Sequence, residues 1–319
     1  MDQSHRVSAW MGLMAAACGW ALAPIFIRYM STVYDPHTQN FLRYVSAALP
    51  LLVISLIWFR EDLAAAFRGY KGMLGIAVLN VLQQHVWTLG CAGSTATTAQ
   101  LVPKLSMVFV ILFSFFLFHE ERSVIKSPFY AVGTFLSFLG AAAVISDNPS
   151  TMVPSLDFPT LMLLATALLW AVYTVWAKHL VMNVHPIPMF TVLSVYTTIG
   201  FAVLSPLTGD TYRLVTAGWY PAAVGIVSGL IPIALAHPAF HYAQKNLGSA
   251  LCTSVALFNP LVTYAIALWI FPDEHMVLTQ WLGAALLLLG TLLVIYAGRR
   301  NLANGRNGAR ARHTPPTTG

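Results

Sequence analysis

One lysine lies inside an otherwise apolar stretch of sequence. Lys104 occurs in AQLVPKLSMVF, about 13 Å into a predicted helix at about 1.5 Å per residue. A lysine in the middle of a membrane helix costs about 2.5–3.5 kcal/mol, so it normally faces protein or water. We expect Lys104 to bind the carboxylate of a ligand, helped by Gln100 one turn earlier. The alternatives are that Lys104 caps a carbonyl freed by a neighbouring proline, or that it snorkels.

Polar residues also recur at helical spacing in two other apolar stretches. Asn80, Gln84 and Trp87 share one stripe of NVLQQHVWTLGC, and His237 and His241 lie one turn apart in IPIALAHPAFHYAQKNLG. We expect these side chains to line a shared cavity; the alternative is hydrogen bonding between helices. The histidine pair could bind a metal ion, but no carboxylate or cysteine completes a ligand set. The sequence therefore predicts no metal and no cofactor.

Two tryptophans stand at equivalent places in the two halves of the chain. Trp20 and Trp170 are each followed by alanine, and Tyr173 lies one turn beyond Trp170. Aromatic rings of this kind stack on flat or apolar ligands and bind cations through their faces. We expect these three side chains to contact a ligand, with ordinary helix packing as the alternative.

The placement of charged residues bears on the energy source. All 11 Asp and Glu residues fall in predicted loops, at helix ends or in the tail. Coupling to protons or sodium ions commonly uses carboxylates within the membrane. The pattern therefore favours facilitated diffusion or exchange, with the histidines left as possible proton carriers. Arg43 is close to the end of a predicted helix, where we expect it to snorkel.

The overall composition identifies an integral membrane protein. The chain has 319 residues, of which 57% are hydrophobic and 9% charged, whereas soluble domains carry about 25% charged residues. A membrane-spanning helix needs about 20 mainly apolar residues. The sequence predicts ten such helices: 9–30, 37–59, 70–91, 95–117, 126–145, 157–178, 187–207, 219–242, 248–270 and 275–297.

Lys and Arg residues predict the orientation of these helices. Most of them fall on one side of the predicted membrane, which places both termini in the cytoplasm by the positive-inside rule. Residues 299–319 are rich in arginine and are expected to form a disordered cytoplasmic tail. The net charge of +6 is then a topology signal and a contact with anionic lipid, and we expect no nucleic-acid partner.

The sequence also contains an internal repeat. GTFLSFLGAAAVI begins at Gly133 and GAALLLLGTLLVI begins at Gly283, with the two glycines of each at the same spacing. Each copy holds five predicted helices, so the second copy would enter the membrane from the opposite side. Inverted repeats of this kind are typical of transporters with a binding site at the interface of the halves. We therefore expect repeats at 1–148 and 149–298, with helices five and ten packing through their glycine faces against each other or against the rest of the bundle.

The arrangement resembles the drug/metabolite transporter superfamily and, within it, the ten-helix EamA-type members. The similarity runs from about residue 9 to 297 and rests on the G-x6-G helices, GWA (19–21) and LWA (169–171), and the acidic ends FHEE (118–121) and FPDE (271–274). One departure is that NPLVTY carries Pro260 where the first half has Met107. The resemblance implies a solute exporter or facilitator whose cavity lies among spans 1, 3, 4, 6, 8 and 9. The match is nearest to the aromatic amino-acid exporter branch.

The sequence thus predicts a multi-pass transporter of the bacterial inner membrane, not an enzyme. It would move small amphipathic metabolites, foremost aromatic amino acids, by alternating access, as a monomer in contact with membrane lipid. Exporters of cationic drugs or of nucleosides and sugars are the nearer alternatives. A membrane-embedded enzyme would need a reactive cluster that the sequence lacks, and a photoreceptor with Lys104 as a Schiff-base lysine would lack an acidic counter-ion.

Overall fold

Helices make up most of the chain in the computed structural model, which describes residues 3–117, 127–146, 156–181, 185–247, 252 and 255–312. No β-strand occurs in these ranges, as the sequence predicts. The elements are α1 (Gln3–Met30), α2 (Pro36–Trp58), α3 (Arg60–Arg68), α4 (Tyr70–Ala92), α5 (Ala96–Leu101), the 3₁₀ segment η1 (Val102–Leu105), α6 (Ser106–Leu117), α8 (Pro128–Val144), α9 (Phe158–Val181), α10 (Pro186–Thr208), α11 (Arg213–Thr216), α12 (Trp219–Gly229), the π-helical segment η3 (Leu230–Leu235), α13 (Ala236–Leu247), α15 (Asn259–Ile270) and α16 (Leu278–Arg312).

Six helical stretches are long and apolar enough to cross a membrane. They are Val7–Met30, Pro36–Trp58, Phe158–Trp176, Pro186–Thr208, Trp219–Gln244 and Leu278–Ala297. The apolar helices α8 and α15 are shorter, α4 carries a run of polar side chains, and the path through α5 and α6 is broken at η1. Each of the ten predicted spans contains helix. In the described residues, however, only six helices are long and apolar enough to cross a membrane. The number of ten crossings therefore stays a prediction.

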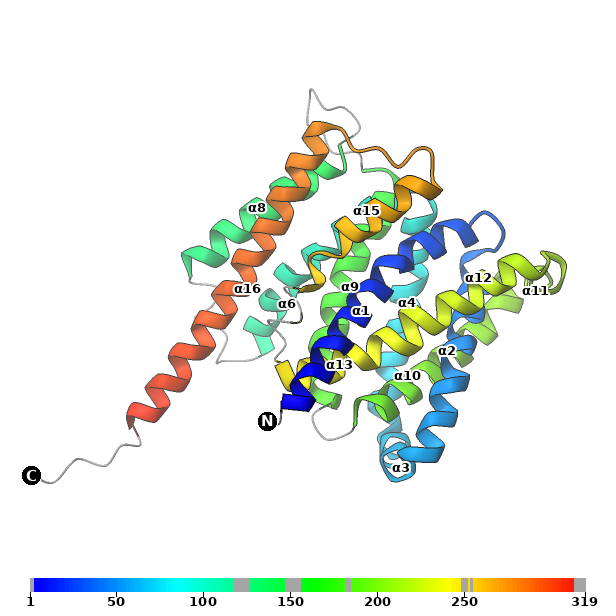
Figure 1. Cartoon of the computed structure of the whole chain (residues 1–319), viewed down its shortest axis with the longest axis horizontal. Helices are drawn as coiled ribbons and strands as arrows, with labels where there is room; N and C mark the ends of the chain where they lie inside the picture. Colours follow the sequence, from blue (N-terminus) through cyan, green and yellow to red (C-terminus); the bar gives the residue numbers. More distant parts are fainter. Residues whose placement is uncertain are drawn as a thin grey trace, which may run out of the picture.

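The long helices pair between the two halves of the chain. Helix α1 packs against α13 and α15, while α9 packs against α4 and α6. Helix α2 packs against α10, and α8 against α16, the latter pair lying side by side in Figure 1. In the repeat, α1 corresponds to α9, α4 to α13 and α6 to α15. The contacts of α1 with α13 and α15 are therefore equivalent to the contacts of α9 with α4 and α6, and the α2–α10 and α8–α16 pairs each join two equivalent helices. The N-terminal end of α1 and the C-terminal end of α16 point toward the same end of the bundle (Figure 1).

The repeated glycines explain how α8 and α16 approach each other. A Cβ atom added to Gly133 would lie 2.7 Å from the carbonyl oxygen of Gly290, and one added to Gly140 would lie 2.5 Å from that of Gly283. Both distances are shorter than a side chain tolerates, so only glycine fits at these crossings. The two helices are antiparallel, so the first glycine of each repeat motif meets the second glycine of the other motif. The glycines therefore hold helices five and ten against each other.

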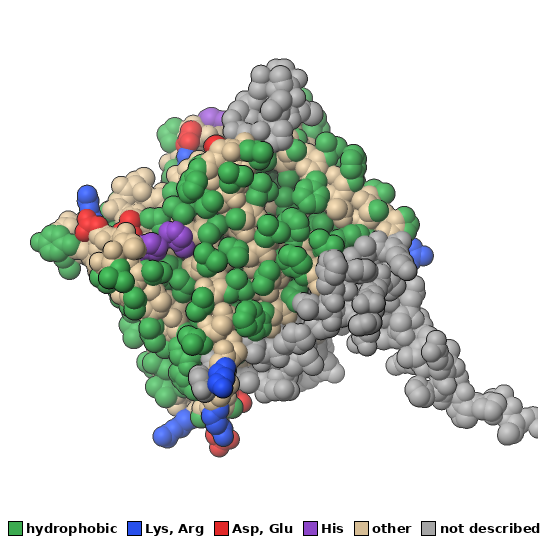
Figure 2. Space-filling view, turned by 180° about the vertical axis from the view of Figure 1, so that it is seen from behind, with side chains coloured by type: hydrophobic (Ala, Val, Ile, Leu, Met, Phe, Trp, Pro, Cys, Tyr) green, Lys and Arg blue, Asp and Glu red, His purple; other side chains and the backbone are tan. Residues whose placement is uncertain are grey.

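The bundle buries polar side chains together with its apolar core, and large apolar side chains also cover its outside. Arg43, Asn40 and Gln84 are at most 4% exposed, whereas Trp269 is 91% exposed. Figure 2 shows hydrophobic side chains across the middle of one face, with charged side chains gathered at its edges. Such a surface suits lipid around the middle and water at the two ends, because charged side chains avoid the hydrocarbon layer.

The last helix is longer than the predicted span. Helix α16 continues to Arg312, so residues 299–312 are helical where the sequence analysis expects a disordered tail. The segment also contains Gly305 and Gly308, which disfavour helix, so its composition does not explain the extension; continuing a helix that is already formed adds residues without a new nucleation cost.

The α8–α16 contact gives a stability prediction. Gly140→Ala should lower the free energy of unfolding in detergent by about 1–3 kcal/mol, because the new methyl group forces the two helices apart. The matched control is Gly69→Ala, where the nearest atom to an added Cβ is 3.5 Å away and where we expect a change of less than about 0.5 kcal/mol. Equal effects of the two substitutions would contradict the packing described here.

Candidate functional site

The two repeat tryptophans meet at one histidine. The ring of His237 lies 5.1 Å from that of Trp20 and 6.4 Å from that of Trp170, measured between centroids. Phe190 stacks on the same imidazole at 4.6 Å, and Tyr173 stacks on Trp170 at 5.2 Å. These rings come from α1, α9, α10 and α13. The structure therefore brings four of the predicted ligand contacts together into an aromatic cluster (Trp20, Trp170, Tyr173, Phe190 and His237).

A break in the helix ladder orients His237. Pro232 and Pro238 have no N–H group; Pro232 lies within the π-helical segment η3, and Pro238 lies in the first turn of α13. Short π-helical segments often mark functional sites. Nδ1 of His237, in the first turn of α13, lies 2.9 Å from the carbonyl oxygen of Pro232 in η3. The histidine thus contacts the backbone of the neighbouring segment η3, while its ring lies next to the two tryptophans.

The hydrogen bonds of His237 depend on its tautomer. The indole N–H of Trp20 lies 3.3 Å from the same Nδ1 atom that contacts the Pro232 carbonyl. A neutral imidazole nitrogen either donates or accepts, whereas the indole only donates and the carbonyl only accepts. When Nδ1 carries the proton it bonds Pro232, and the indole N–H of Trp20 is then available to a ligand.

His241 is at the edge of the aromatic cluster. Its Nδ1 atom lies 3.1 Å from the side-chain oxygen of Gln244, and its ring is 6.4 Å from Phe190. Within the part of the chain that the structure describes, no group of three His, Cys, Asp or Glu side chains could hold a metal ion.

Gln100 supports the backbone of α1 beside the cluster. Pro24 has no N–H group, so the carbonyl oxygen of Trp20, four residues earlier, has no helical partner. The side-chain amide of Gln100 donates to that oxygen at 3.0 Å. Gln100 therefore fixes the turn of α1 that carries the Trp20 ring.

Lys104 makes a similar bond in the other half of the chain. Its ammonium group donates to the carbonyl oxygen of Ala256 at 3.0 Å. Residue 260 would supply the helical N–H for that oxygen, but it is a proline. Lys104 thus caps a carbonyl freed by Pro260, the arrangement that the sequence analysis left open as an alternative. The ammonium group has two further N–H donors.

The predicted polar stripe of α4 divides into satisfied and unsatisfied groups. Asn80 is buried and donates to the Tyr44 hydroxyl and to Thr197, each at 3.0 Å, which ties α4 to α2 and α10. Gln84 uses its amide nitrogen on Gln83, but its side-chain oxygen has no partner, and neither has the indole nitrogen of Trp87. A buried polar atom without a partner costs about 1–3 kcal/mol, so these two atoms are candidates for ligand or water contacts.

Arg43 differs from the sequence expectation. It is 1% exposed and does not snorkel: Nε donates to Ser228 at 3.0 Å, and Nη1 donates to the side-chain oxygen of Asn40 at 2.9 Å. Helix α12 covers it because Gly229 permits close approach to α2; an added Cβ there would lie 2.8 Å from Cβ of Ser46. The covering helix is far along the chain, so no local pattern near Arg43 signals its burial.

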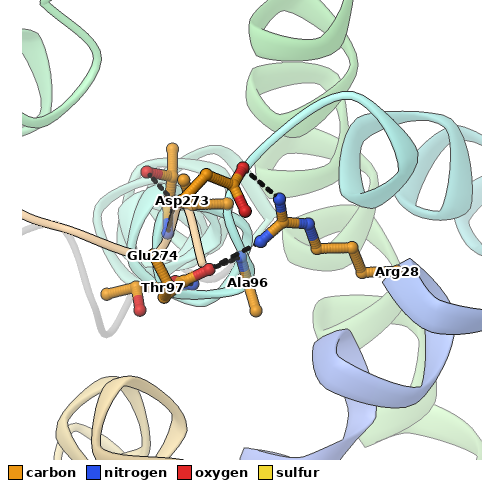
Figure 3. Close-up of polar contacts among 7 residues, drawn as sticks. Arg28, Ala96, Thr97, Asp273 and Glu274 are labelled. Atoms are coloured by element: carbon orange, nitrogen blue, oxygen red, sulfur yellow. Dashed lines mark hydrogen bonds and ion pairs between the residues drawn. The ribbon is translucent and has the colours of Figure 1, made fainter. Parts of the chain in front are cut away.

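A charged network joins α1, α5 and the loop before α16 (Figure 3). The buried carboxylate of Glu274 accepts from the Arg28 guanidinium at 2.8 Å and from the backbone N–H groups of Ala96 and Thr97 at 3.0 and 2.7 Å. Asp273 forms a second, exposed ion pair with Arg28. The carboxylate caps the start of α5 and the cation lies in the last turn of α1, so both charges suit the helix dipoles.

This network uses one of the two acidic motifs that the sequence analysis singled out. The equivalent motif FHEE (118–121) lies outside the described residues, and so does the side chain of Lys178, which corresponds to Arg28.

Known proteins match the chain over most of its length. The sequence matches the EamA-like transporter family twice, over residues 7–146 and again over 158–296. An uncharacterized transporter of Archaeoglobus fulgidus is 26% identical over 254 residues, covering 79% of this chain and 84% of the relative. An uncharacterized transporter of Haemophilus influenzae is 21% identical over 291 residues, covering 84% and 91%. A crystal structure of a protein with 15% identity has a TM-score of 0.64 over 92% of this chain and 98% of that chain, which shows a shared fold.

The bond of Lys104 can be tested by a double-mutant cycle with Pro260. Lys104→Met should cost more stability in the wild-type chain than in a Pro260→Ala background, by about 0.5–1.5 kcal/mol, because residue 260 then donates its own N–H to Ala256. Thermal unfolding of the four proteins in detergent measures this coupling. Equal costs in both backgrounds would show that Lys104 does not serve this carbonyl.

Proposed function

The chain belongs to the EamA-like transporter family, part of the drug/metabolite transporter superfamily, and on this premise we propose that it moves small amphipathic metabolites across the membrane. We favour export of amino acids, aromatic ones first. The observation that carries this choice is the aromatic cluster, which gathers rings from both family-matched segments around His237. Stacked rings favour a flat, apolar solute body.

The proposed mechanism is alternating access by two inverted five-helix repeats, at 1–148 and 149–298. Three observations support it: the family matches twice, the helix contacts persist when the halves are exchanged, and α8 and α16 meet antiparallel through equivalent glycines. Transporters with inverted repeats rock one set of helices against the other around a site near the midplane. The π-helical segment η3 contacts His237 of the aromatic cluster, and irregular backbone within a membrane bundle is tolerated where it is buried in protein or lines a cavity.

The proposed binding residues are those of the sequence analysis, with roles adjusted to their contacts. Trp20, Trp170, Tyr173, His237 and His241 provide the aromatic surface. Gln84 and Trp87 contribute their unpartnered polar atoms to the solute. Asn80, Gln100 and Lys104 hold neighbouring helices in place, and Lys104 adds positive charge to the centre of the bundle.

Orientation and location remain part of the proposal. Both termini are placed in the cytoplasm of a bacterial inner-membrane protein that functions as a monomer. The N-terminal end of α1 and the C-terminal end of α16 lie at the same end of the bundle as α3, which carries Arg60 and Arg68 (Figure 1). Arginines at the end that holds both termini fit the positive-inside rule.

The positive charges inside the bundle favour a solute with an anionic group over a cationic drug. The described helices bury Arg43 and enclose Lys104, and the described carboxylates lie at helix ends or in loops. Two cations without a nearby acid repel a cationic solute and attract an anionic group. Aromatic rings alone would accept a cation, so competition experiments are needed to separate the two substrate classes.

Transport can be measured with purified protein in proteoliposomes. We expect saturable flux of radiolabelled phenylalanine or tryptophan, inhibited by the other aromatic amino acids and not by tetraphenylphosphonium. Inhibition by tetraphenylphosphonium alone would favour the cationic-drug alternative. Absence of saturable flux for every aromatic amino acid would reject the proposed substrate class.

The role of the aromatic cluster is tested by a pair of tryptophan variants. Trp170→Ala should raise the KM for phenylalanine by about three- to tenfold, because an aromatic contact contributes about 0.5–1.5 kcal/mol. Trp269→Ala removes a tryptophan that is 91% exposed on the outer surface, and its KM should stay unchanged. A normal KM for Trp170→Ala would remove this ring from the proposed binding surface.

A further inference from the structure

Arg43 is a buried cation that the described structure leaves without an anionic partner. Its two hydrogen bonds go to neutral acceptors, the hydroxyl of Ser228 and the amide oxygen of Asn40. No bond to Nη2 is present among the described residues. A guanidinium group has five N–H donors in a planar fork, so donors remain for another group.

The carboxylates of the described chain are committed elsewhere or far away. The ion pairs there join Arg28 to Asp273 and Glu274, and Arg213 to Asp210, all near helix ends. Burying a charge away from water costs several kcal/mol unless a partner compensates it. Charged residues inside membrane bundles are accordingly retained where they serve a function. Arg43, at 1% exposure, is in this situation.

Arg43 also lies beside the aromatic cluster. Tyr44, the next residue of α2, belongs to the same buried apolar cluster as Tyr173 and Phe190, and the Ser228 that Arg43 contacts lies two residues before η3. Tyr44 also accepts a hydrogen bond from Asn80 of α4. One solute could therefore contact the rings with its apolar body and Arg43 with an anionic group.

The helix next to Arg43 offers an acceptor as well. Asn40, which orients Arg43, also donates to the backbone oxygen of Gln84 at 3.4 Å and to Thr88 at 2.9 Å. The side chain of Gln84 is 4% exposed, and its oxygen has no partner. An acceptor of this kind suits the ammonium group of an amino acid.

We propose that Arg43 binds the carboxylate of the transported solute and thereby selects aromatic acids over aromatic amines. The inference rests on the proposed function and names the group that decides its specificity. A carboxylate accepts two parallel N–H bonds from a guanidinium, an arrangement that a lysine cannot provide. Lys104 is the weaker choice because the two donors left on its ammonium group do not form the planar fork that matches a carboxylate.

The first test needs no variant. Purified wild-type protein in detergent is heated with phenylalanine, 3-phenylpropionate or phenylethylamine, and ligand binding raises the unfolding temperature. We expect stabilisation by phenylalanine and 3-phenylpropionate and at most a weak effect of phenylethylamine. Equal stabilisation by the acid and the amine would overturn the role of Arg43.

The second test neutralises Arg43 in place. Asn40→Asp keeps the shape of residue 40 and presents a carboxylate to Nη1 of Arg43, which lies 2.9 Å from the present amide oxygen. The internal ion pair should weaken binding of 3-phenylpropionate by about thirtyfold or more and favour phenylethylamine. Thr88→Val is the matched control, because it removes the same Asn40–Thr88 hydrogen bond without a change of charge and should keep the preference for acids.

These measurements separate the inference from the proposed function. If no aromatic solute crosses proteoliposomes but the acid still stabilises wild-type protein and not Asn40→Asp, the proposed function fails and the anion site stands. If phenylalanine is transported while Asn40→Asp keeps the wild-type preference for acids, the role of Arg43 is wrong and the proposed function stands. If Asn40→Asp does not fold, the acid–amine comparison on wild-type protein decides alone.

Discussion

Backbone carbonyl groups that have lost their helical donor decide how this bundle is built. No water is available in the hydrocarbon layer, so such groups need partners within the protein. Proline removes the donor at Pro24 and Pro260, and the side chains of Gln100 and Lys104 replace it from other helices. Next to the π-helical segment η3, Nδ1 of His237 lies 2.9 Å from the carbonyl oxygen of Pro232. The Gln100 and Lys104 bonds thereby join two parts of the chain at each point where a proline interrupts a helix.

This constraint separates two kinds of polar side chain in the centre of the molecule. Gln100, Asn80 and Lys104 are engaged with neighbouring helices and give the bundle its geometry. The side-chain oxygen of Gln84 and the indole nitrogen of Trp87 are left without partners. An interior in which most polar groups are satisfied draws attention to the few that are not, because a solute that satisfies them gains binding energy the protein itself leaves unused.

Sequence patterns predict the helical class of the fold because it depends on local composition, and the repeated glycines mark the close-packing faces of α8 and α16 without naming their partner. The same holds for Trp20 and Trp170, whose equivalence is visible in the repeat and which meet at His237. Family membership was also accessible, since the paired motifs extend along the chain.

Contacts between residues far apart in the chain could not be predicted from local sequence patterns. The burial of Arg43 depends on Gly229 in a distant helix, and the cap that Glu274 places on the start of α5 depends on a loop far along the chain. Lys104 is an intermediate case: the sequence offers a proline-freed carbonyl as one partner, and only the fold identifies it as the carbonyl of Ala256.

The glycine contact between α8 and α16 has the geometry of an isologous interface. Gly133 meets Gly290 and Gly140 meets Gly283, so each helix presents to its partner the surface that it receives. Two-fold homodimers are joined by surfaces of this kind, in which one patch is complementary to itself. A half-length chain carrying a single copy would already possess the means to dimerise, and fusing two copies into one polypeptide would then replace a concentration-dependent assembly by an intramolecular one.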